Sequence, residues 1–319
     1  MTATSKGPEQ TDNAVLPVES DGLEPVKIES PASSLVAIEL AVKSHEGNVR
    51  LTNEDHYLVV RAERSLNTVQ SNLPEGALKP SFHETAFGMA IADGIGGMPA
   101  GGVASRMALR KLVDLVVKTP DWVMRMDRRK ANTVMRRMAN RFRQIDITLR
   151  RHSERDPRLA GMGTTMTVAC SLGSDLFVGH IGDSRAYLIR RDELHQLTRD
   201  HTVAQRMIDA KVAGEQDDSV RGFRRVLTAA LGSTSQPSDP DVLRFYLRDG
   251  DQLLLCTDGL TEHVDSETIA SILRHSETAE DACKALVGEA LNRGGVDNVT
   301  VLLARYRFPK AERAADTKR

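Results

Sequence analysis

Acidic residues at four well-separated positions of the sequence each adjoin a short apolar run. Runs of this kind are typical of buried strands, so the acids are expected at strand ends. If the strands belong to one fold, carboxylates that are far apart in the sequence can converge at one rim of a sheet. The acids and their runs are Glu54-Asp55 before residues 57–60, Asp93-Gly94 after residues 87–92, Asp258-Gly259 after residues 253–257, and Asp297-Asn298 before residues 299–304.

This set of oxygen ligands favours one kind of metal site. Carboxylates, backbone carbonyls and water suit hard divalent ions such as Mg²⁺ and Mn²⁺. The glycines after Asp93 and Asp258 allow a sharp turn and a close approach of a ligand to the main chain. A single Asp-Gly pair is more often a β-turn. Three such strand ends together with an acidic pair favour a metal centre instead.

The composition argues against several classes of protein. The chain has 319 residues, 40% of them hydrophobic, which is enough for a sizeable core in one large domain or two small ones. The net charge of -1 gives no field that would attract nucleic acid or an anionic membrane. No apolar run is long enough to cross a bilayer. The three cysteines lack C-x-x-C spacing and lie in apolar segments, which predicts reduced core residues in a cytoplasmic protein.

The order of the expected elements indicates an α+β fold. Strands are predicted first, then two helices, then many strands, then two helices and one last strand. This order lacks the strict alternation of a parallel sheet and fits two mainly antiparallel sheets with a helix pair on each outer face. Strands are expected at residues 35–42, 57–61, 87–92, 164–171, 176–182, 185–190, 193–197, 226–231, 243–247, 253–257 and 299–307, and helices at 102–118, 122–151, 202–210, 266–273 and 279–292. Ser266 is predicted to be the N-cap of the helix at 266–273.

Several stretches are expected to lie outside this regular structure. Residues 1–33 are rich in small and polar groups and are predicted to be a disordered leader; residues 34–308 form the folded domain and 309–319 a loose tail. Residues 63–84 read as a long polar loop. Residues 214–223 are polar without periodicity and are predicted to be a mobile surface flap. The arginines of residues 122–151 are interpreted as a solvated helix face rather than a membrane or nucleic acid contact.

Together, the short motifs of this sequence resemble those of the bacterial metal-dependent (PPM, type 2C) Ser/Thr protein phosphatases. Each motif alone is weak, but seven in the family's order make a chance match improbable, and they extend over residues 35–307. The motifs are Arg50-x-x-Asn53-Glu54-Asp55, Asp93-Gly94-x-Gly96-Gly97, Gly163-Thr164-Thr165, Gly182-Asp183-Ser184-Arg185, Leu227-Thr228-x-x-Leu231-Gly232, Asp258-Gly259-Leu260-Thr261 and Asp297-Asn298.

The resemblance implies a four-layer α-β-β-α sandwich with a centre of two Mn²⁺ or Mg²⁺ ions at one end of the sheets. It places Asp93 as the bridge between the ions and the Gly94 carbonyl on one of them. It places Asp258 and Asp297 on the other ion, with Glu54 and Asp55 acting directly or through water. Arg50 falls at the family's phosphate-binding arginine.

The implied chemistry is physically reasonable. Phosphomonoesters hydrolyse extremely slowly unaided, and two ions about 3.5–4 Å apart can lower the pKa of a shared water and present hydroxide to phosphorus. A guanidinium can bind two phosphate oxygens through parallel hydrogen bonds, which supports Arg50 as a phosphate ligand. The alternative for Arg50 is an ion pair with a nearby acid.

Other polar residues receive plainer interpretations. Gly182-Asp183-Ser184-Arg185 is predicted to be a structural turn, with Asp183 capping backbone groups and Arg185 paired nearby, rather than a catalytic element. His201 is expected to be a surface histidine rather than a proton donor, and His56 to begin a strand rather than bind metal. His45 stands where many family members have Asp, which leaves the role of its loop open. Asp156 is the only acid considered for a weak third ion, which is not assigned.

Three functional hypotheses follow. The first is an active phosphatase that releases phosphate from Ser and Thr of phosphorylated proteins and opposes a bacterial Ser/Thr kinase, as a cytoplasmic monomer without nucleic acid or membrane partners. The second is a catalytically weak regulatory module with the same fold, which the complete set of acids disfavours. The third is a regulator phosphatase with one dedicated partner, which is disfavoured because sensor and membrane segments are not seen.

Overall fold

Antiparallel strand pairing organises the structure, a computed structural model that describes residues 36–74, 77, 81–96, 100–118, 128–214, 217–232 and 239–308. Two five-stranded sheets face each other, and a two-stranded sheet joins β4 (Gly94–Ile95) to β5 (Gly163–Thr164). The first sheet has the order β1 (Ala37–His45), β12 (Val299–Arg307), β11 (Gln252–Cys256), β8 (Arg185–Arg190), β9 (Glu193–Gln196). The second has the order β10 (Asp241–Tyr246), β7 (Asp175–Ile181), β6 (Met166–Leu172), β3 (Ser81–Ala92), β2 (His56–Asn67).

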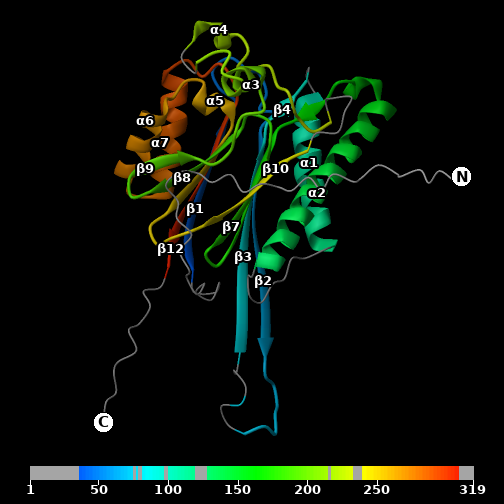
Figure 1. Cartoon of the computed structure of the whole chain (residues 1–319), viewed down its shortest axis with the longest axis vertical. Helices are drawn as coiled ribbons and strands as arrows, with labels where there is room; N and C mark the ends of the chain where they lie inside the picture. The colour runs from blue at the N-terminus through cyan, green and yellow to red at the C-terminus, as the bar shows by residue number, and fades with distance from the viewer. Residues whose placement is uncertain are drawn as a thin grey trace, which may run out of the picture.

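Helix pairs cover the outer faces of the two sheets (Figure 1). Helices α1 (Ala100–Lys118) and α2 (Arg128–Arg155) pack on the second sheet, and α6 (Ser266–His275) and α7 (Ala279–Asn292) pack on the first. Short helices α3 (Val203–Asp209), α4 (Asp218–Arg221) and α5 (Asp258–Thr261) gather with β4 at one end, and the 3₁₀ helix η2 (Pro157–Leu159) follows α2. The predicted four-layer sandwich is therefore confirmed.

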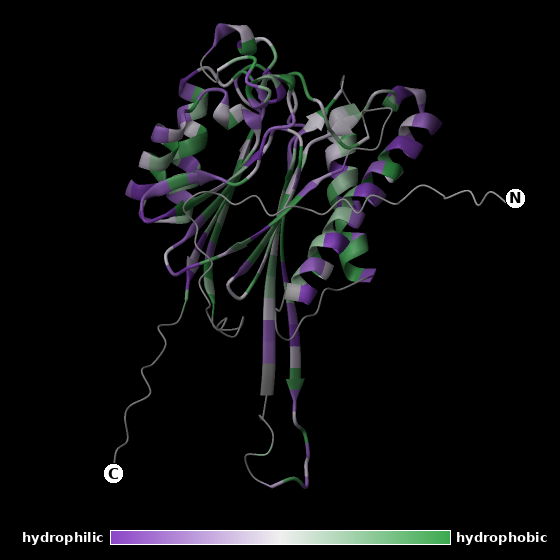
Figure 2. Ribbon diagram, viewed as in Figure 1, coloured by the Kyte–Doolittle hydropathy of each residue, from purple (hydrophilic) through white to green (hydrophobic). Residues whose placement is uncertain are grey.

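Three apolar layers hold the sandwich together. Between the sheets lie side chains such as Ile91, Val178 and Leu302, and each helix pair encloses a layer of its own. Central strands β7 and β12 are buried on both faces, which explains their nearly continuous apolar sequences. Helix α2 turns apolar side chains at helical spacing toward its sheet and hydrophilic ones outward, as expected for a solvated outer face (Figure 2).

The structure differs from the sequence predictions about elements at five points. The region of residues 63–84 is not a single loop, because β2 extends to Asn67 and β3 begins at Ser81, forming a long hairpin whose outer half has no third strand. Residues 226–231 form two isolated bridges rather than a strand. Helix α6 is capped by Asp265, whose Oδ1 accepts from the Thr268 N–H at 2.8 Å, and not by Ser266. Helix α5 was not predicted, and α4 gives the proposed flap some regular structure. The proposed leader and tail lie outside the described residues.

Candidate metal centre and active site

The four groups of acids predicted from the sequence lie at the same end of the sandwich. Asp93 follows β3, Asp258 opens α5 directly after β11, Asp297 precedes β12, and Asp55 precedes β2. Burial raises the pKa of the Asp93 carboxyl well above its usual range, and the negative charges of Asp55, Asp258 and Asp297 raise it further. Thr257, next to Asp258, donates to Asp55 Oδ2, and Gly259 packs against Asn298, next to Asp297. The topology therefore brings these carboxylates together.

Asp55 is the most firmly held of the acids. Its Oδ2 accepts hydrogen bonds from Thr257 Oγ1 at 2.9 Å and from Thr300 Oγ1 at 2.7 Å. Its Oδ1 is buried and accepts no hydrogen bond from any described residue. Burial raises the pKa of Asp55 to about 6, although the two threonine donors act in the opposite direction. A buried carboxylate oxygen without a donor is costly, and a cation would satisfy it.

Asp258 has the same unusual feature. Its Oδ1 is buried without a donor within the described part of the chain. Burial is the largest cause that raises its pKa, followed by the charges of Asp183, Glu262 and Asp297. The neighbouring Gly259 lies so close to the backbone of Asn298 that an added Cβ would stand 2.0 Å from its carbonyl oxygen. Glycine is therefore required here, and this contact brings Asp258 beside the segment that carries Asp297.

The backbone at Asp93 and Gly94 is fixed by the segment between η2 and β6. The Asp93 carbonyl oxygen accepts from Thr164 Oγ1 at 2.7 Å and from the Thr165 N–H at 2.9 Å. Gly94 pairs with Thr164 in the small sheet and contacts Gly101 of α1, where a Cβ on Gly94 would lie 2.4 Å from the Gly101 carbonyl. The Gly163-Thr164-Thr165 motif thus positions the Asp93-Gly94 turn.

Glu54 lies at the start of α1 rather than among the buried acids. Its Oε1 accepts from the Gly102 N–H at 3.4 Å, and its backbone carbonyl accepts from Ser105 Oγ at 2.6 Å. Asn298 Oδ1 accepts from the Glu54 N–H at 2.8 Å, which ties this segment to the one that follows Asp297. A carboxylate at a helix N-terminus is electrostatically favourable, so the start of α1 helps to hold the Glu54 side chain in place.

Arg50 reaches the same cluster from the loop before β2. Its Nη2 lies 2.6 Å from Asp297 Oδ2, and its side chain is more than half exposed. This hydrogen bond is the largest cause that raises the pKa of Arg50, and the charges of Asp93 and Glu54 act in the same direction. The ion pair with a nearby acid is therefore present, and it holds the guanidinium at the edge of the carboxylate cluster.

The donor set fits hard divalent cations. Two buried carboxylate oxygens without donors, the Asp93 and Asp297 carboxylates and the Gly94 carbonyl are all oxygen ligands. In the described part of the chain, however, no three acidic, histidine or cysteine side chains are placed so that they alone could hold one ion. The shell around an ion would have to include carbonyl or other oxygen ligands besides the side chains.

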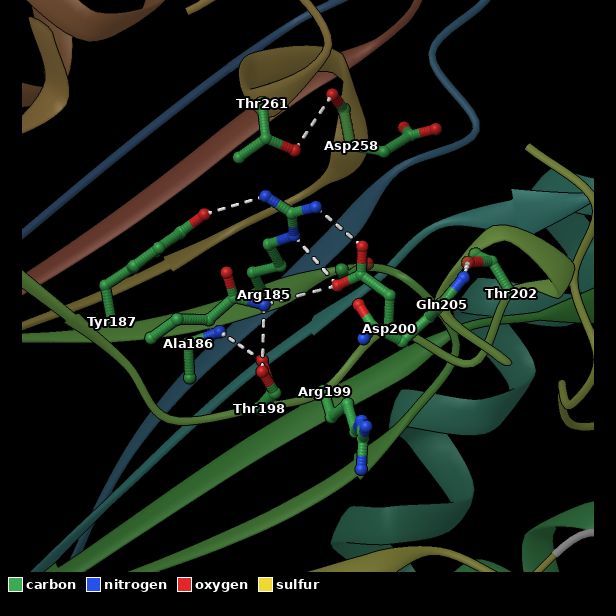
Figure 3. Close-up of polar contacts among 12 residues, drawn as sticks. Arg185, Ala186, Tyr187, Thr198, Arg199, Asp200, Thr202, Gln205, Asp258 and Thr261 are labelled. Atoms are coloured by element: carbon green, nitrogen blue, oxygen red, sulfur yellow. Dashed lines mark hydrogen bonds and ion pairs between the residues drawn. The ribbon is translucent and has the colours of Figure 1, made fainter. Parts of the chain in front are cut away.

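A polar cavity of about 710 Å³ opens beside Asp258, between the end of the first sheet and helices α3 and α4. Arg185 lies on its wall, with Nε and Nη2 donating to Asp200 at 2.8 and 2.6 Å and Nη1 donating to Tyr187 Oη at 3.0 Å (Figure 3). Asp183 lies in the turn between β7 and β8, as predicted, and also lines the cavity. Its burial raises its pKa to about 7.

Sequence reasoning missed the residues that support the site. Asp55 is held by Thr257 and Thr300, and Glu54 by Asn298, each across 200 or more positions of the sequence. Of these three supporting residues, only Asn298 lies in a motif that the sequence had singled out. His201 differs from the expected surface histidine, because it is mostly buried, bonds Asp241 Oδ2 at 3.1 Å and accepts from the Gly182 N–H. His56 begins β2 and contacts Ser105 Oγ at 2.9 Å.

Two further residues named from the sequence stand apart from the acids. His45 Nδ1 accepts from the Gly47 N–H at 2.9 Å, so this histidine shapes its own loop. Asp156 caps η2 and pairs with Arg158 at 2.7 Å. Neither contact brings the side chain to the carboxylate cluster. None of the described helices is long and apolar enough to span a membrane.

Comparisons with known proteins agree with this geometry. The family model for protein phosphatase 2C matches residues 89–299. The serine/threonine protein phosphatase PstP of Mycobacterium tuberculosis is 32% identical over 269 residues, which are 84% of this chain and 45% of PstP, so the chain spans less than half of that relative. The serine/threonine phosphatase stp of Listeria monocytogenes is 32% identical over 213 residues, which are 67% of this chain and 82% of that relative.

Solved structures give the same result. The catalytic domain of PstP, solved in complex with two manganese ions, is 30% identical to this chain, with a TM-score of 0.65. The alignment covers 85% of this chain and 99% of that domain. The Stp1 phosphatase from Staphylococcus aureus has a TM-score of 0.68 at 24% identity, which supports the fold.

Proposed function

The chain belongs to the protein phosphatase 2C family, and from this premise we propose that it hydrolyses phosphoserine and phosphothreonine in phosphorylated proteins with two Mn²⁺ or Mg²⁺ ions. The observation that carries the proposal is the pair of buried oxygens, Asp55 Oδ1 and Asp258 Oδ1, that have no donor in the described structure. They stand within a cluster of carboxylates whose mutual repulsion cations would relieve.

The residues are assigned roles as follows. Asp93 would be a ligand of both ions, the Gly94 carbonyl would be a ligand of one ion, and Asp258 and Asp297 would be ligands of the other. Asp55 and Glu54 act directly or through water; the threonine hydrogen bonds to Asp55 favour a fixed orientation and leave one oxygen available. When bound, ions of this kind lower the pKa of water and offset the charge of the phosphoryl group.

Arg50 is proposed to bind the phosphate group. Its half-exposed guanidinium lies at the edge of the acid cluster, and its ion pair with Asp297 Oδ2 keeps it there. A planar guanidinium can hold two phosphate oxygens and orient the phosphorus toward the cluster. It would also offset charge on the transferring group.

The cellular setting is also part of the proposal. Phosphoserine and phosphothreonine are the products of Ser/Thr kinases, so the phosphatase is proposed to oppose such a kinase in the cytoplasm and to act as a monomer. The relatives are named as serine/threonine phosphatases. The alternative of a catalytically weak module is not favoured, because all the acids expected of an active member are present.

The test is metal dependence on a phosphothreonine peptide. Phosphate release is measured with the full chain in EDTA and after return of Mn²⁺ or Mg²⁺. We expect no release in EDTA and restored release with either ion. Full activity after removal of metal, or no activity with any divalent ion, would refute the assignment.

A further inference from the structure

Large apolar side chains are exposed in segments that adjoin the carboxylate cluster. Five of them have exposed fractions of 40–87% and lie within one or two residues of Arg50, Arg225 or Asp297 in the sequence. We call this set the apolar rim. Its first bank is Val49, Leu51 and Val296, and its second bank is Phe223 and Val226.

The first bank is held by the contacts that place Arg50. The Asn48 N–H donates to the Gly295 carbonyl at 2.6 Å, and Arg50 Nη2 lies 2.6 Å from Asp297 Oδ2. Val49 and Leu51 stand on either side of Arg50 in the chain, and Val296 directly precedes Asp297. Two loops far apart in sequence therefore present apolar side chains next to the phosphate-binding arginine.

The second bank lies at the base of the flap region. Ala204 N donates to the Phe223 carbonyl at 3.2 Å and Val203 N to the Val226 carbonyl at 2.8 Å, which holds this segment against α3. Arg225, between them, makes a two-pronged ion pair with Glu262 at the end of α5. Arg225, Glu262 and Asp258 line the same cavity, so this bank adjoins one of the acids.

We propose that the apolar rim selects phosphopeptides whose phosphorylated residue is flanked on both sides by apolar side chains. The inference rests on the proposed phosphatase activity and adds a substrate class to it. One bank adjoins Arg50 and the other adjoins the cavity beside Asp258. A peptide with its phosphate at these groups would bring its neighbouring side chains to both banks and cover exposed apolar surface.

The test compares three substrates with the full chain in Mn²⁺. Two phosphothreonine peptides of equal length carry either Val and Leu or Ser and Gly on both sides of the phosphothreonine, and para-nitrophenyl phosphate reports the chemistry without flanks. We expect the native chain to prefer the apolar peptide by about tenfold in kcat/KM. This is the factor expected from the burial of one apolar side chain.

Two double variants remove the banks separately. They are Val49→Ser with Leu51→Ser, and Phe223→Ser with Val226→Ser. Each is expected to reduce the preference severalfold, through a loss on the apolar peptide that exceeds any loss on para-nitrophenyl phosphate. Matched controls are Leu66→Ser on the outer hairpin and Val117→Ser on α1, which are 59% and 73% exposed; both are expected to keep the preference.

The outcomes separate this inference from the proposed function. No preference in the native chain, an unchanged preference in both double variants, or an equal loss with the controls would overturn the rim. If all three substrates are hydrolysed in a metal-dependent way and the two peptides react at equal rates, the proposed function is supported and the selective role of the apolar rim is refuted. Absence of metal-dependent hydrolysis of all three would overturn the proposed function itself.

Discussion

Arg50 Nη2 lies 2.6 Å from Asp297 Oδ2, so the proposed phosphate ligand and a proposed metal ligand are hydrogen-bonded to each other. The pair joins residues 247 positions apart and is partly exposed, with 55% of the Arg50 side chain and 24% of the Asp297 side chain accessible. A carboxylate that binds a cation has less negative charge to offer a guanidinium. Metal binding and phosphate binding at this edge are therefore expected to be linked.

Arg50→Ala tests this relationship. The variant loses one or two charge-assisted contacts to phosphate, each contributing roughly 1.5–3 kcal/mol, so kcat/KM should fall by about ten- to a thousandfold. Because the guanidinium no longer pairs with Asp297, metal affinity should be at least as high as in the native chain. Arg50→Lys should recover only part of the rate, because an ammonium lacks the planar fork. Steady-state kinetics and metal titration measure both effects.

Inorganic phosphate supplies the control for Arg50. It should inhibit Arg50→Ala less than the native chain, while Asp93→Ala should be inactive in the same assay. Native kcat/KM together with native inhibition by phosphate in Arg50→Ala would remove the arginine from the phosphate site.

Asp258→Asn and Asp297→Asn each remove one negative charge from the site. They should bind Mn²⁺ about tenfold or more weakly, by analogy with the loss of one charge-assisted contact, and keep their fold. Because Asp258 is buried among like charges, its neutralisation should also raise stability in EDTA. Calorimetric metal titration and urea unfolding in EDTA are the measurements. Normal hydrolysis by both variants would show that the metal ligands were assigned wrongly.

The flap is predicted to affect substrate choice more than chemistry. Replacing residues 214–223 with a short Gly/Ser link removes α4 and part of the cavity wall but none of the proposed metal ligands. Rates on phosphoproteins should fall more than rates on para-nitrophenyl phosphate, because loops on a rigid scaffold commonly carry specificity. Equal losses on both kinds of substrate would assign the flap a supporting role at the metal centre.

Thr300→Val tests how Asp55 is held. The hydroxyl donates to Asp55 Oδ2 at 2.7 Å, and valine keeps the shape without the donor. With Asp55 ionised, stability should fall by roughly 1.5–3 kcal/mol, the contribution of a hydrogen bond to a charged group. Ser44→Ala is the control, because Ser44 Oγ contacts the Thr300 hydroxyl at 2.8 Å and not the carboxylate. An equal effect of both substitutions in urea unfolding would contradict a direct role at Asp55.

The sequence predicted elements well where burial imposes a regular pattern. Helix α7 and strand β12 agree with their predicted bounds, because α7 has one apolar face and β12 is buried on both sides. The outer half of the β2–β3 hairpin was taken for a loop, since its exposed strand β2 shows no apolar alternation there. The N-cap of α6 was assigned to Ser266 although Asp265 is an equally good capping residue.

The site was predictable only in part, for a related reason. Acids at strand ends leave a local signal, and the sequence indicated which carboxylates could converge. The donors to Asp55 are Thr300 within strand β12 and Thr257 directly after β11, and their role depends on contacts over 202 and 245 positions. The pairing of Arg50 with Asp297 likewise depends on how two loops meet, which no local pattern encodes.

The last prediction concerns the pH dependence of stability and His180. This imidazole is fully buried, with Nδ1 2.9 Å from Thr167 Oγ1 and Nε2 3.1 Å from the Arg199 carbonyl. Burial lowers its pKa to about 4, and the neighbouring ring of His201 acts in the same direction, while Asp200 and Asp241 oppose it.

Between about pH 4 and 6.5 the unfolded chain binds a proton at this position that the folded chain does not, so stability rises with pH there. His180 therefore contributes stability that is fully present above pH 6.5 and is lost as pH falls toward 4, up to about 3 kcal/mol at one pKa unit per 1.36 kcal/mol. The carboxyls of Asp93 and Asp258, whose pKa values are raised, act in the opposite sense, so the contribution of His180 must be isolated by comparing the native chain with a His180 variant.

His180→Gln should show a shallower fall in stability from pH 7 to pH 4.5 than the native chain in urea unfolding with EDTA, whereas the exposed His83→Gln should follow the native curve. Parallel curves for the native chain and His180→Gln would mean that His180 is not held neutral by the fold.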